Sequence, residues 1–381
     1  MKRVGIITYH RATNYGAVLQ AYSLLNILRK EIGQLASIEI IDYSTRMATN
    51  DHHRTVLSSF LHDGFGSGME EMKKNRMFCM FSNSLVDSKP KIISDDIKIV
   101  NDFMNCHFDI VISGSDAVFS WNGKKFPSAY LLGEEAGFKR MSYAASAHRL
   151  KYYDEPPEYI DYCERAFSNY YYLGVRDSET ERFVKYCLPD AKPIHNCDPS
   201  FLIDLDSIKE KINYSKLIHS QKPVIFVMTQ NEKIGRAVND SFGHDYCIVS
   251  LFVKNKAIKN HLGSITPFEW ACIFSYGVLT VTEYFHATIF SLLNGVPVVS
   301  IDSSSFSNGY EGKIHDLLCN RLHLNNMYIN IDDVTREGEG VVTHLAHNLL
   351  TTNNRDVITA AINNEKQYYL SFQNSLTQAL S

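Results

Sequence analysis

The sequence predicts an α/β protein of two Rossmann-like domains that face each other across a cleft. Its 381 residues exceed what one compact core usually supports. Short apolar runs that do not alternate with polar residues recur along the chain, and helical patterns lie between them. Such runs indicate parallel strands covered on both faces. The 45% of hydrophobic and 21% of charged residues exclude a disordered chain.

Nine runs rich in Val, Ile and Tyr predict the strands. They fall into a first set and a second set, separated by a polar, charged stretch over 200–223. The runs are 4–9, 38–43, 109–116, 141–146 and 172–177, then 223–229, 246–252, 277–283 and 296–302. We therefore predict an N-terminal domain over 1–205, on the acceptor side, and a C-terminal domain over 206–355, on the donor side. A C-terminal helix over 356–381 would pack on either one.

Capping signals mark several predicted helices. Thr266 with Glu269, and Ser178 with Glu181, have the spacing of a capping box, in which each side chain satisfies a backbone N–H at the helix start. Residues 50–105 fit the repeating scheme least well. Their Met- and Phe-rich helix over 69–85 is interpreted as a packing face, and the alternative is a membrane contact.

Composition excludes several functional classes. The formal charge of −4, with both signs interspersed, gives no footprint for nucleic acid. None of the eight cysteines forms a C-x-x-C pair, so no zinc or redox motif is indicated, and we predict no metal site. The N-terminus lacks a signal-peptide pattern, and no apolar stretch approaches the roughly 20 residues of a spanning helix. We expect a cytoplasmic protein.

Ligands of open α/β sheets bind at the carboxyl ends of the strands. After the first strand, Asn14 and Gly16 open a helix that would suit an anionic or sugar ligand; the alternative is a tight turn. After the third strand, Ser115 and Asp116 could hold a sugar hydroxyl; the alternative for Asp116 is a helix N-cap.

Three basic or titratable residues also lie where a predicted strand ends or a predicted helix begins. Arg176, at a strand end, presents a fork for a carboxylate or phosphate, or else forms a salt bridge with Asp177 or Glu179. His286 follows an apolar strand, where proton-transfer groups occur; the alternative is a buried structural histidine. Lys313 starts another helix, and by itself would be a solvated surface residue.

Taken in order, these stretches resemble the polysaccharide pyruvyl transferase family. The matching segments run through the core: "GIITYHRATNYGAVLQAYSLLNIL", "IEIIDY", "FDIVISGSDAVFSW", "SYAAS", "GVRDSET", "CDPSFLI", "TPFEW" and "EYFHATIFSLLNGVPVV". Ala117 and Phe119 stand where the family usually has Gln and Trp, and Tyr284 where Ser or Arg is commoner. These departures bear on the acceptor more than on the chemistry.

The resemblance implies a GT-B-like fold, phosphoenolpyruvate as donor and a sugar of a surface glycan as acceptor, joined as a pyruvate ketal. It implies Arg176 for the donor carboxylate, Lys313 for the phosphate, and His286 as general acid or as phosphate ligand. Asn14, Gly16, Ser115 and Asp116 fall on the acceptor side. No hydride moves, so no redox cofactor is expected.

A lipid-linked acceptor would bring the chain to the inner face of the membrane, as a peripheral protein, and the 69–85 helix could supply the contact. Two other functions stay open. One is a nucleotide-sugar glycosyltransferase of the same fold, and the other is a non-catalytic relative that binds glycan.

Overall fold

A computed structural model describes residues 1–62, 64–87, 90–120, 128–133, 136–147, 150–210, 212, 214, 217–304 and 311–381, with the backbone alone at 48, 50–53 and 56. The chain forms two compact units: unit 1 is 1–203 with 367–381, and unit 2 is 204–366. The predicted division was at 205/206. Residues 211, 213, 215 and 216 of the predicted connection lie outside the described residues.

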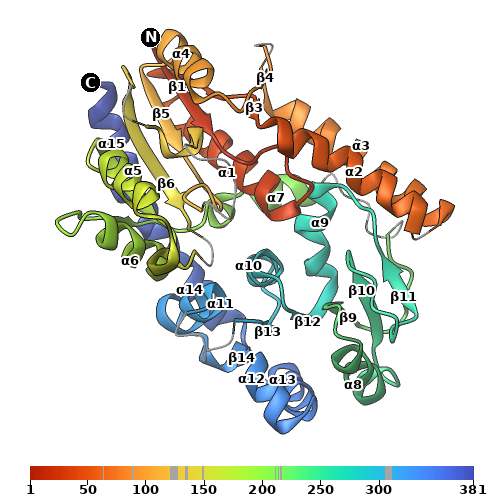
Figure 1. Cartoon of the computed structure of the whole chain (residues 1–381). Coiled ribbons are helices and arrows are strands. Elements are labelled where there is room, and N and C mark those ends of the chain that lie inside the picture. The colour runs from red at the N-terminus through yellow and green to blue at the C-terminus, as the bar shows by residue number, and fades with distance from the viewer. Residues whose placement is uncertain are drawn as a thin grey trace. The chain divides into compact units, whose positions relative to one another are not determined.

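Unit 1 is built on a parallel six-stranded sheet of order β2-β1-β5-β6-β7-β8 (Figure 1). Its strands are β1 (Lys2–Ile7), β2 (Ala36–Ile40), β5 (Ile110–Ser113), β6 (Lys139–Ala145), β7 (Tyr170–Val175) and β8 (Ile194–His195). Its helices are α1 (Tyr15–Ile32), α2 (Arg46–His62), α3 (Phe65–Leu85), α4 (Ile97–His107), α5 (Pro157–Phe167), α6 (Ser178–Cys187) and α15 (Leu370–Leu380). A separate two-stranded sheet pairs β3 (Tyr43–Ser44) with β4 (Ile92–Ile93). After β1 the chain adds β2 on one side of this strand, and it then adds β5 to β8 on the other side. The switch point of the sheet therefore lies between β1 and β5.

Unit 2 has a second parallel sheet, of order β11-β10-β9-β12-β13-β14. Its strands are β9 (Val224–Met228), β10 (Cys247–Leu251), β11 (Asn260–Leu262), β12 (Gly277–Thr282), β13 (Val298–Asp302) and β14 (Tyr328–Asn330). Its helices are α7 (Leu205–Lys209), α8 (Glu232–Phe242), α9 (Pro267–Ile273), α10 (Phe285–Leu293), α11 (Lys313–His315), α12 (Ile331–Glu337), α13 (Gly340–Thr351) and α14 (Arg355–Lys366). This is the strand order of a dinucleotide-binding Rossmann sheet, and its switch point lies between β9 and β12.

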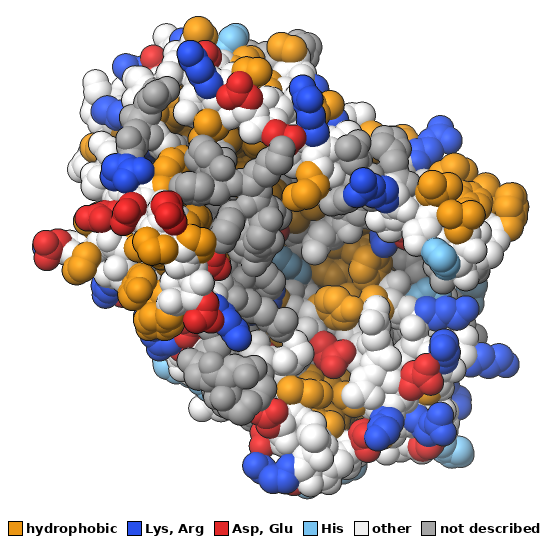
Figure 2. All heavy atoms as spheres, in the orientation of Figure 1, with side chains coloured by type: hydrophobic (Ala, Val, Ile, Leu, Met, Phe, Trp, Pro, Cys, Tyr) orange, Lys and Arg blue, Asp and Glu red, His pale blue; other side chains and the backbone are white. Residues whose placement is uncertain are grey.

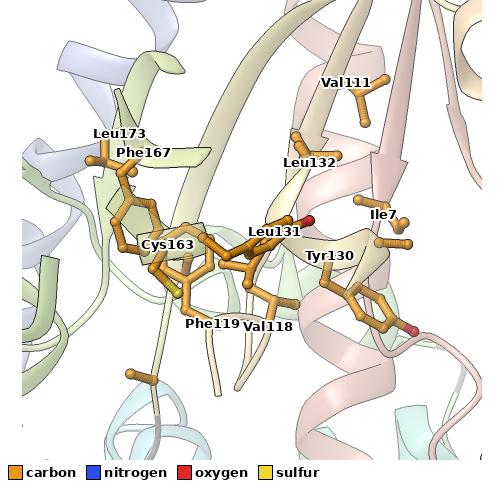
Figure 3. Close-up of a cluster of buried hydrophobic side chains, with 14 of the residues drawn as sticks. Ile7, Val111, Val118, Phe119, Tyr130, Leu131, Leu132, Cys163, Phe167 and Leu173 are labelled. Carbon is orange, nitrogen blue, oxygen red and sulfur yellow. The ribbon is translucent and has the colours of Figure 1, made fainter. Parts of the chain in front are cut away.

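A large hydrophobic cluster in unit 1 joins the sheet to three helices. Ile7 and Val111 from the strands meet Met104 of α4, Phe167 of α5 and Phe183 of α6. Figure 3 shows Phe119, Leu131 and Leu132, from the segments that follow β5, in the same cluster as Ile7, Val111 and Phe167. The predicted strand runs are apolar throughout because both faces of these strands are covered.

The predicted helix starts are partly confirmed. Thr266 and Glu269 form the expected capping box of α9. The predicted box of Ser178 with Glu181 is wrong, because Asp177 is the N-cap of α6 and accepts from Thr180 N. The described helices contain no stretch long and apolar enough to cross a membrane.

The predicted C-terminal helix is divided between the units. Its first part, α14, belongs to unit 2, whereas α15 belongs to unit 1. Phe372 of α15 is fully buried. Its ring lies 4.7 Å from that of Tyr143 and 5.3 Å from that of Tyr172, measured between centroids. These contacts with β6 and β7 hold the end of the chain on the sheet of unit 1.

Phe372→Ala is expected to lower the free energy of unfolding of unit 1 by about 3–5 kcal/mol, because a buried aromatic side chain would leave a cavity. Urea unfolding followed by circular dichroism measures this change. The control is Leu370→Ala in the same helix. This side chain is 48% exposed, so its removal is expected to lower the free energy of unfolding by only a few tenths of a kcal/mol. Equal effects of the two variants would show that α15 does not stabilise unit 1 in this way.

Candidate active site

The carboxyl ends of β1, β5, β6 and β7 are linked to one another in unit 1. Thr8 Oγ1, just after β1, donates to the carbonyl of Ser115 at 3.3 Å. The carbonyl of Asp116 accepts from Ser146 N at 2.9 Å, and Arg176 N donates to the carbonyl of Ala145 at 2.9 Å. Ser115, Asp116 and Arg176 are therefore brought to one edge of the sheet, next to its switch point.

Arg176 lies at the centre of a buried ion-pair network. Its side chain is 2% exposed, its Nη1 is 3.2 Å from Asp198 Oδ2, and its Nε is 3.7 Å from Asp177 Oδ2. Gln20 of α1 donates to the same Asp198 oxygen at 2.5 Å. The salt bridge with Asp177, which was one alternative from the sequence, is present. A direct contact between Arg176 and a donor stays a prediction.

The charges in this network stabilise one another. Burial alone would raise the pKa of Asp177, but Arg176 and hydrogen bonds from Ser146 and Thr180 lower it below its usual value. Burial opposes the charge of Arg176 as well, and Asp198, Asp177 and Asp116 more than offset this and raise its pKa. Arg176 is thus a fixed cation that carboxylates already balance.

The other unit 1 candidates differ in their surroundings. Asn14 is the N-cap of α1 and accepts from Ala17 N at 3.3 Å, and Gly16 is buried in the first turn of that helix. Ser115 is 1% exposed, and its Oγ has no hydrogen-bond partner among the described residues. Asp116 has a φ of 73°, and no helix begins there, so the N-cap alternative is wrong.

His286 and Lys313 meet around one aromatic ring in unit 2. His286 is the second residue of α10, directly after the switch-point strand β12. Its ring lies edge-on to that of Phe285, with centroids 5.3 Å apart. Lys313 Nζ lies 5.2 Å from the centroid of the same Phe285 ring, in a cation–π contact. A half-buried imidazole and an ammonium group therefore flank the N-terminus of α10, which itself favours anions.

Two further residues at this edge were not predicted as site residues. Thr229, after β9, donates its hydroxyl to the carboxylate of Glu283, after β12. Glu311 accepts from the ring of His315 at 2.9 Å, and His315 N donates to Asp302 at 3.2 Å, which fixes the start of α11 beside Lys313. Thr229 and Glu283 are the last residues of the predicted strand runs 223–229 and 277–283. This position at a strand end was the signal that could have identified them as site residues.

The model of polysaccharide pyruvyl transferase matches residues 14–305, more than half of the 381 residues. The chain belongs to the polysaccharide pyruvyl transferase family. The resemblance seen in the sequence is thereby confirmed. The matched range contains every candidate site residue except Lys313.

Solved structures similar to this pyruvyl transferase family member extend over both units. UDP-GlcNAc 2-epimerase from Methanocaldococcus jannaschii has 10% identity and a TM-score of 0.56, covering 98% of this chain and 100% of its own. The enzyme from Neisseria meningitidis bound to UDP-GlcNAc has 12% identity and a TM-score of 0.55, covering 97% and 100%. This likeness confirms the GT-B-like α/β fold. No curated protein gives a significant match.

The described residues of this family member contain no group of His, Cys, Asp or Glu arranged to hold a metal ion. The chemical groups that the structure gathers are instead an imidazole with an ammonium group in unit 2, and a guanidinium with hydroxyl and carboxylate groups in unit 1.

Proposed function

We propose that this chain transfers the pyruvyl group of phosphoenolpyruvate to two hydroxyls of one sugar, in a surface polysaccharide or its precursor. The product is a ketal, and phosphate is released. The observation that carries the proposal is the placement of His286 and Lys313 around the Phe285 ring, at the switch point of a sheet, in a chain of the pyruvyl transferase family.

The donor has a phosphate and a carboxylate, so its site needs cations. Lys313 supplies a point charge for the phosphate, next to the N-terminus of α10. Arg176 would hold the carboxylate through its planar fork. Because Asp177 and Asp198 already balance its charge, the geometry of the fork would contribute more to donor binding than net charge does.

The reaction balances without a redox cofactor. The first sugar hydroxyl adds to C2 of phosphoenolpyruvate and gives up its own proton to the protein, while a proton is delivered from the protein to the methylene carbon, which becomes the methyl group. The second hydroxyl then displaces phosphate from C2, and its proton leaves with the phosphate. His286 would deliver the first proton or hold the departing phosphate. Full activity is expected in the presence of a chelator.

The acceptor would bind at the edge of unit 1. The buried Oγ of Ser115 and the half-buried carboxylate of Asp116 supply a hydrogen-bonding pair suited to two hydroxyls of one sugar. The side-chain oxygen of Asn14 caps α1, so its amide NH₂ is the group that would face a sugar, beside the backbone of Gly16. The reaction would take place in the cytoplasm, at the membrane face where the acceptor is lipid-linked.

Two other functions predict different ligands. A nucleotide-sugar glycosyltransferase would bind a sugar nucleotide, and the likeness to UDP-GlcNAc 2-epimerases concerns the fold alone. A non-catalytic relative would bind glycan without releasing phosphate. The tests of donor binding and of phosphate release distinguish all three.

Phosphoenolpyruvate is expected to raise the thermal midpoint of the full chain, because a ligand at about one hundred times its Kd adds about 2.7 kcal/mol of stability. UDP-GlcNAc at the same concentration should not. Phosphate release is then measured with a panel of cell-envelope glycans. Protection by the sugar nucleotide alone would favour glycosyl transfer, and protection by phosphoenolpyruvate without phosphate release from any glycan would favour the non-catalytic relative.

A further inference from the structure

Unit 1 contains a cavity of about 760 Å³ that is separate from the residues assigned above. It lies between the loop after β1, the β3 strand and the α2–α3 hairpin, the pair of helices that projects from unit 1 in Figure 1. Neither Ser115 nor Asp116 nor Arg176 lines it. Its size is that of a typical small-molecule site.

The serine and threonine hydroxyl groups that line this cavity already donate to the protein. Thr8 donates to the Ser115 carbonyl (3.3 Å) and Ser82 donates to the His10 carbonyl (2.7 Å). Thr13 donates to the side-chain oxygen of Asn75 (3.0 Å), and Thr49 donates to the Thr45 carbonyl (3.1 Å). A sugar would need several donors and acceptors directed at it. The described lining offers few, because these hydroxyl hydrogens are used.

Three cationic side chains line the cavity among the described residues, and an acidic side chain pairs with one of them, Arg11. Arg11 makes two hydrogen bonds to Asp42, at 2.5 and 2.6 Å. Burial alone would raise the pKa of Asp42, but Arg11 and His10 outweigh it and hold that pKa well below its usual range. Within the described parts of the chain, neither Arg76 nor Lys91 forms an ion pair or hydrogen bond. Apart from the phenols of Tyr43 and Tyr130, the side-chain polar groups that remain without a protein partner in the described lining are therefore cationic.

The remaining wall is apolar and aromatic. Leu57, Phe60, Met72 and Phe78 line it from the hairpin. The Tyr130 ring contributes from the other side, with centroids 4.5 Å from Tyr9 and 5.4 Å from Tyr43. Burial raises the pKa of Tyr43 to about 12, so this phenol is neutral at physiological pH and does not repel an anion.

The apolar wall continues to the far end of the hairpin. Leu57 lines the cavity and is itself exposed, and Leu61 and Phe65 beyond it are also exposed. The rings of Phe60 and Phe65 lie 5.9 Å apart. Figure 2 shows this gathering of hydrophobic side chains at the end of the hairpin. An apolar chain could therefore enter from this end and remain out of water along the hairpin.

We propose that this cavity binds a single anionic amphiphile. Its phosphate or diphosphate group would lie between Arg76 and Lys91, and its apolar chain against Leu57, Phe60 and Met72. The charge complementarity is specific, because these two cations have no protein carboxylate to balance them. The further statement that this amphiphile is the lipid carrier of the acceptor rests on the proposed function. The statement that the cavity binds an anionic amphiphile does not.

The test is a calorimetric titration of the full chain with decyl phosphate, below its critical micelle concentration. Decanol and inorganic phosphate are the two reference ligands. Decyl phosphate is expected to bind at least tenfold more tightly than either one. The double variant R76Q/K91Q should weaken decyl phosphate at least tenfold and leave decanol unchanged. The matched control K73Q/K98Q removes two exposed lysines outside the cavity and should leave both affinities unchanged.

Three outcomes would overturn the inference. One is equal loss in both double variants, which would indicate a general charge effect. Another is inorganic phosphate binding as tightly as decyl phosphate, which would indicate a free-phosphate site. The third is association only with anionic lipid vesicles, which would make the hairpin end a membrane contact. The titration contains no phosphoenolpyruvate, so its result does not depend on the proposed reaction. A chain that binds decyl phosphate but releases no phosphate from phosphoenolpyruvate would support the binding site and contradict the proposed function.

Discussion

His286→Ala is expected to reduce phosphate release from phosphoenolpyruvate plus acceptor by about a hundredfold to ten-thousandfold, the usual contribution of a positioned acid or base. The fold should be retained, because the side chain is only half-buried and α10 packs through its apolar residues, such as Ile289 and Phe290. A continuous phosphate assay at saturating donor measures the rate, and circular dichroism checks the fold.

The control for this prediction is His347→Ala, an exposed histidine on α13 of the same unit, which should retain the full rate. The pH profile separates the two roles of His286. A general acid gives a rate that falls as pH rises, and the variant loses this limb of the profile. A phosphate ligand instead shows its loss in the KM of phosphoenolpyruvate, and His286→Lys would restore part of the affinity. A folded His286→Ala protein with the wild-type rate contradicts both roles.

The sequence predicted the two sheets well because the physical signal is local. A run such as 223–229 is apolar throughout, which is the consequence of burial on both faces, and it became β9. The short strands β11 and β14 escaped prediction because three residues carry almost no periodicity. The order of strands in each sheet also needs the folded topology, and this order is what makes the ends of β5 and β12 switch-point positions.

The candidate site was predicted residue by residue but not as contacts. His286 and Lys313 were chosen for their chemistry, and nothing in a separation of 27 positions indicates that Lys313 would lie over the ring of Phe285, the residue next to His286. The Gln20–Asp198 hydrogen bond joins residues far apart in the chain, so no local pattern reveals it. Asp198 was consequently missed, although it is the nearer carboxylate partner of Arg176.

Arg176→Met is expected to lower the free energy of unfolding by about 3–5 kcal/mol, the usual result of leaving a buried carboxylate without its partner. The carboxylate concerned is Asp198, whose side chain is 1% exposed. Urea unfolding at neutral pH measures the loss. The double variant R176M/D198N should recover part of it, because the buried charge of Asp198 is then removed, while Asp177 keeps its hydrogen bonds from Ser146 and Thr180. A double variant as unstable as the single one would mean that packing, and not charge, explains the loss.

The pH dependence of the same network has a definite sign. The pKa of Asp177 is lowered in the folded chain: burial acts against this, and Arg176 with two hydroxyl groups outweighs burial. Stability from this carboxylate is therefore complete above its unfolded pKa, near the usual value for Asp, and is lost as pH falls through the lower folded pKa. Arg176→Met removes much of the shift, so the variant and the wild type should converge in stability in acid. A constant difference between them from neutral pH down to acid would contradict this assignment.

Arg176→Lys separates the structural role from donor binding. Lysine keeps the positive charge near Asp177 and Asp198, so unfolding should change less than in Arg176→Met. It loses the planar fork that would hold a carboxylate through two hydrogen bonds, so the KM of phosphoenolpyruvate should rise about tenfold, the equivalent of about 1.4 kcal/mol. A lysine variant with lower stability and an unchanged KM would make Arg176 a structural residue only. Donor binding would then depend on unit 2, through Lys313 and the N-terminus of α10.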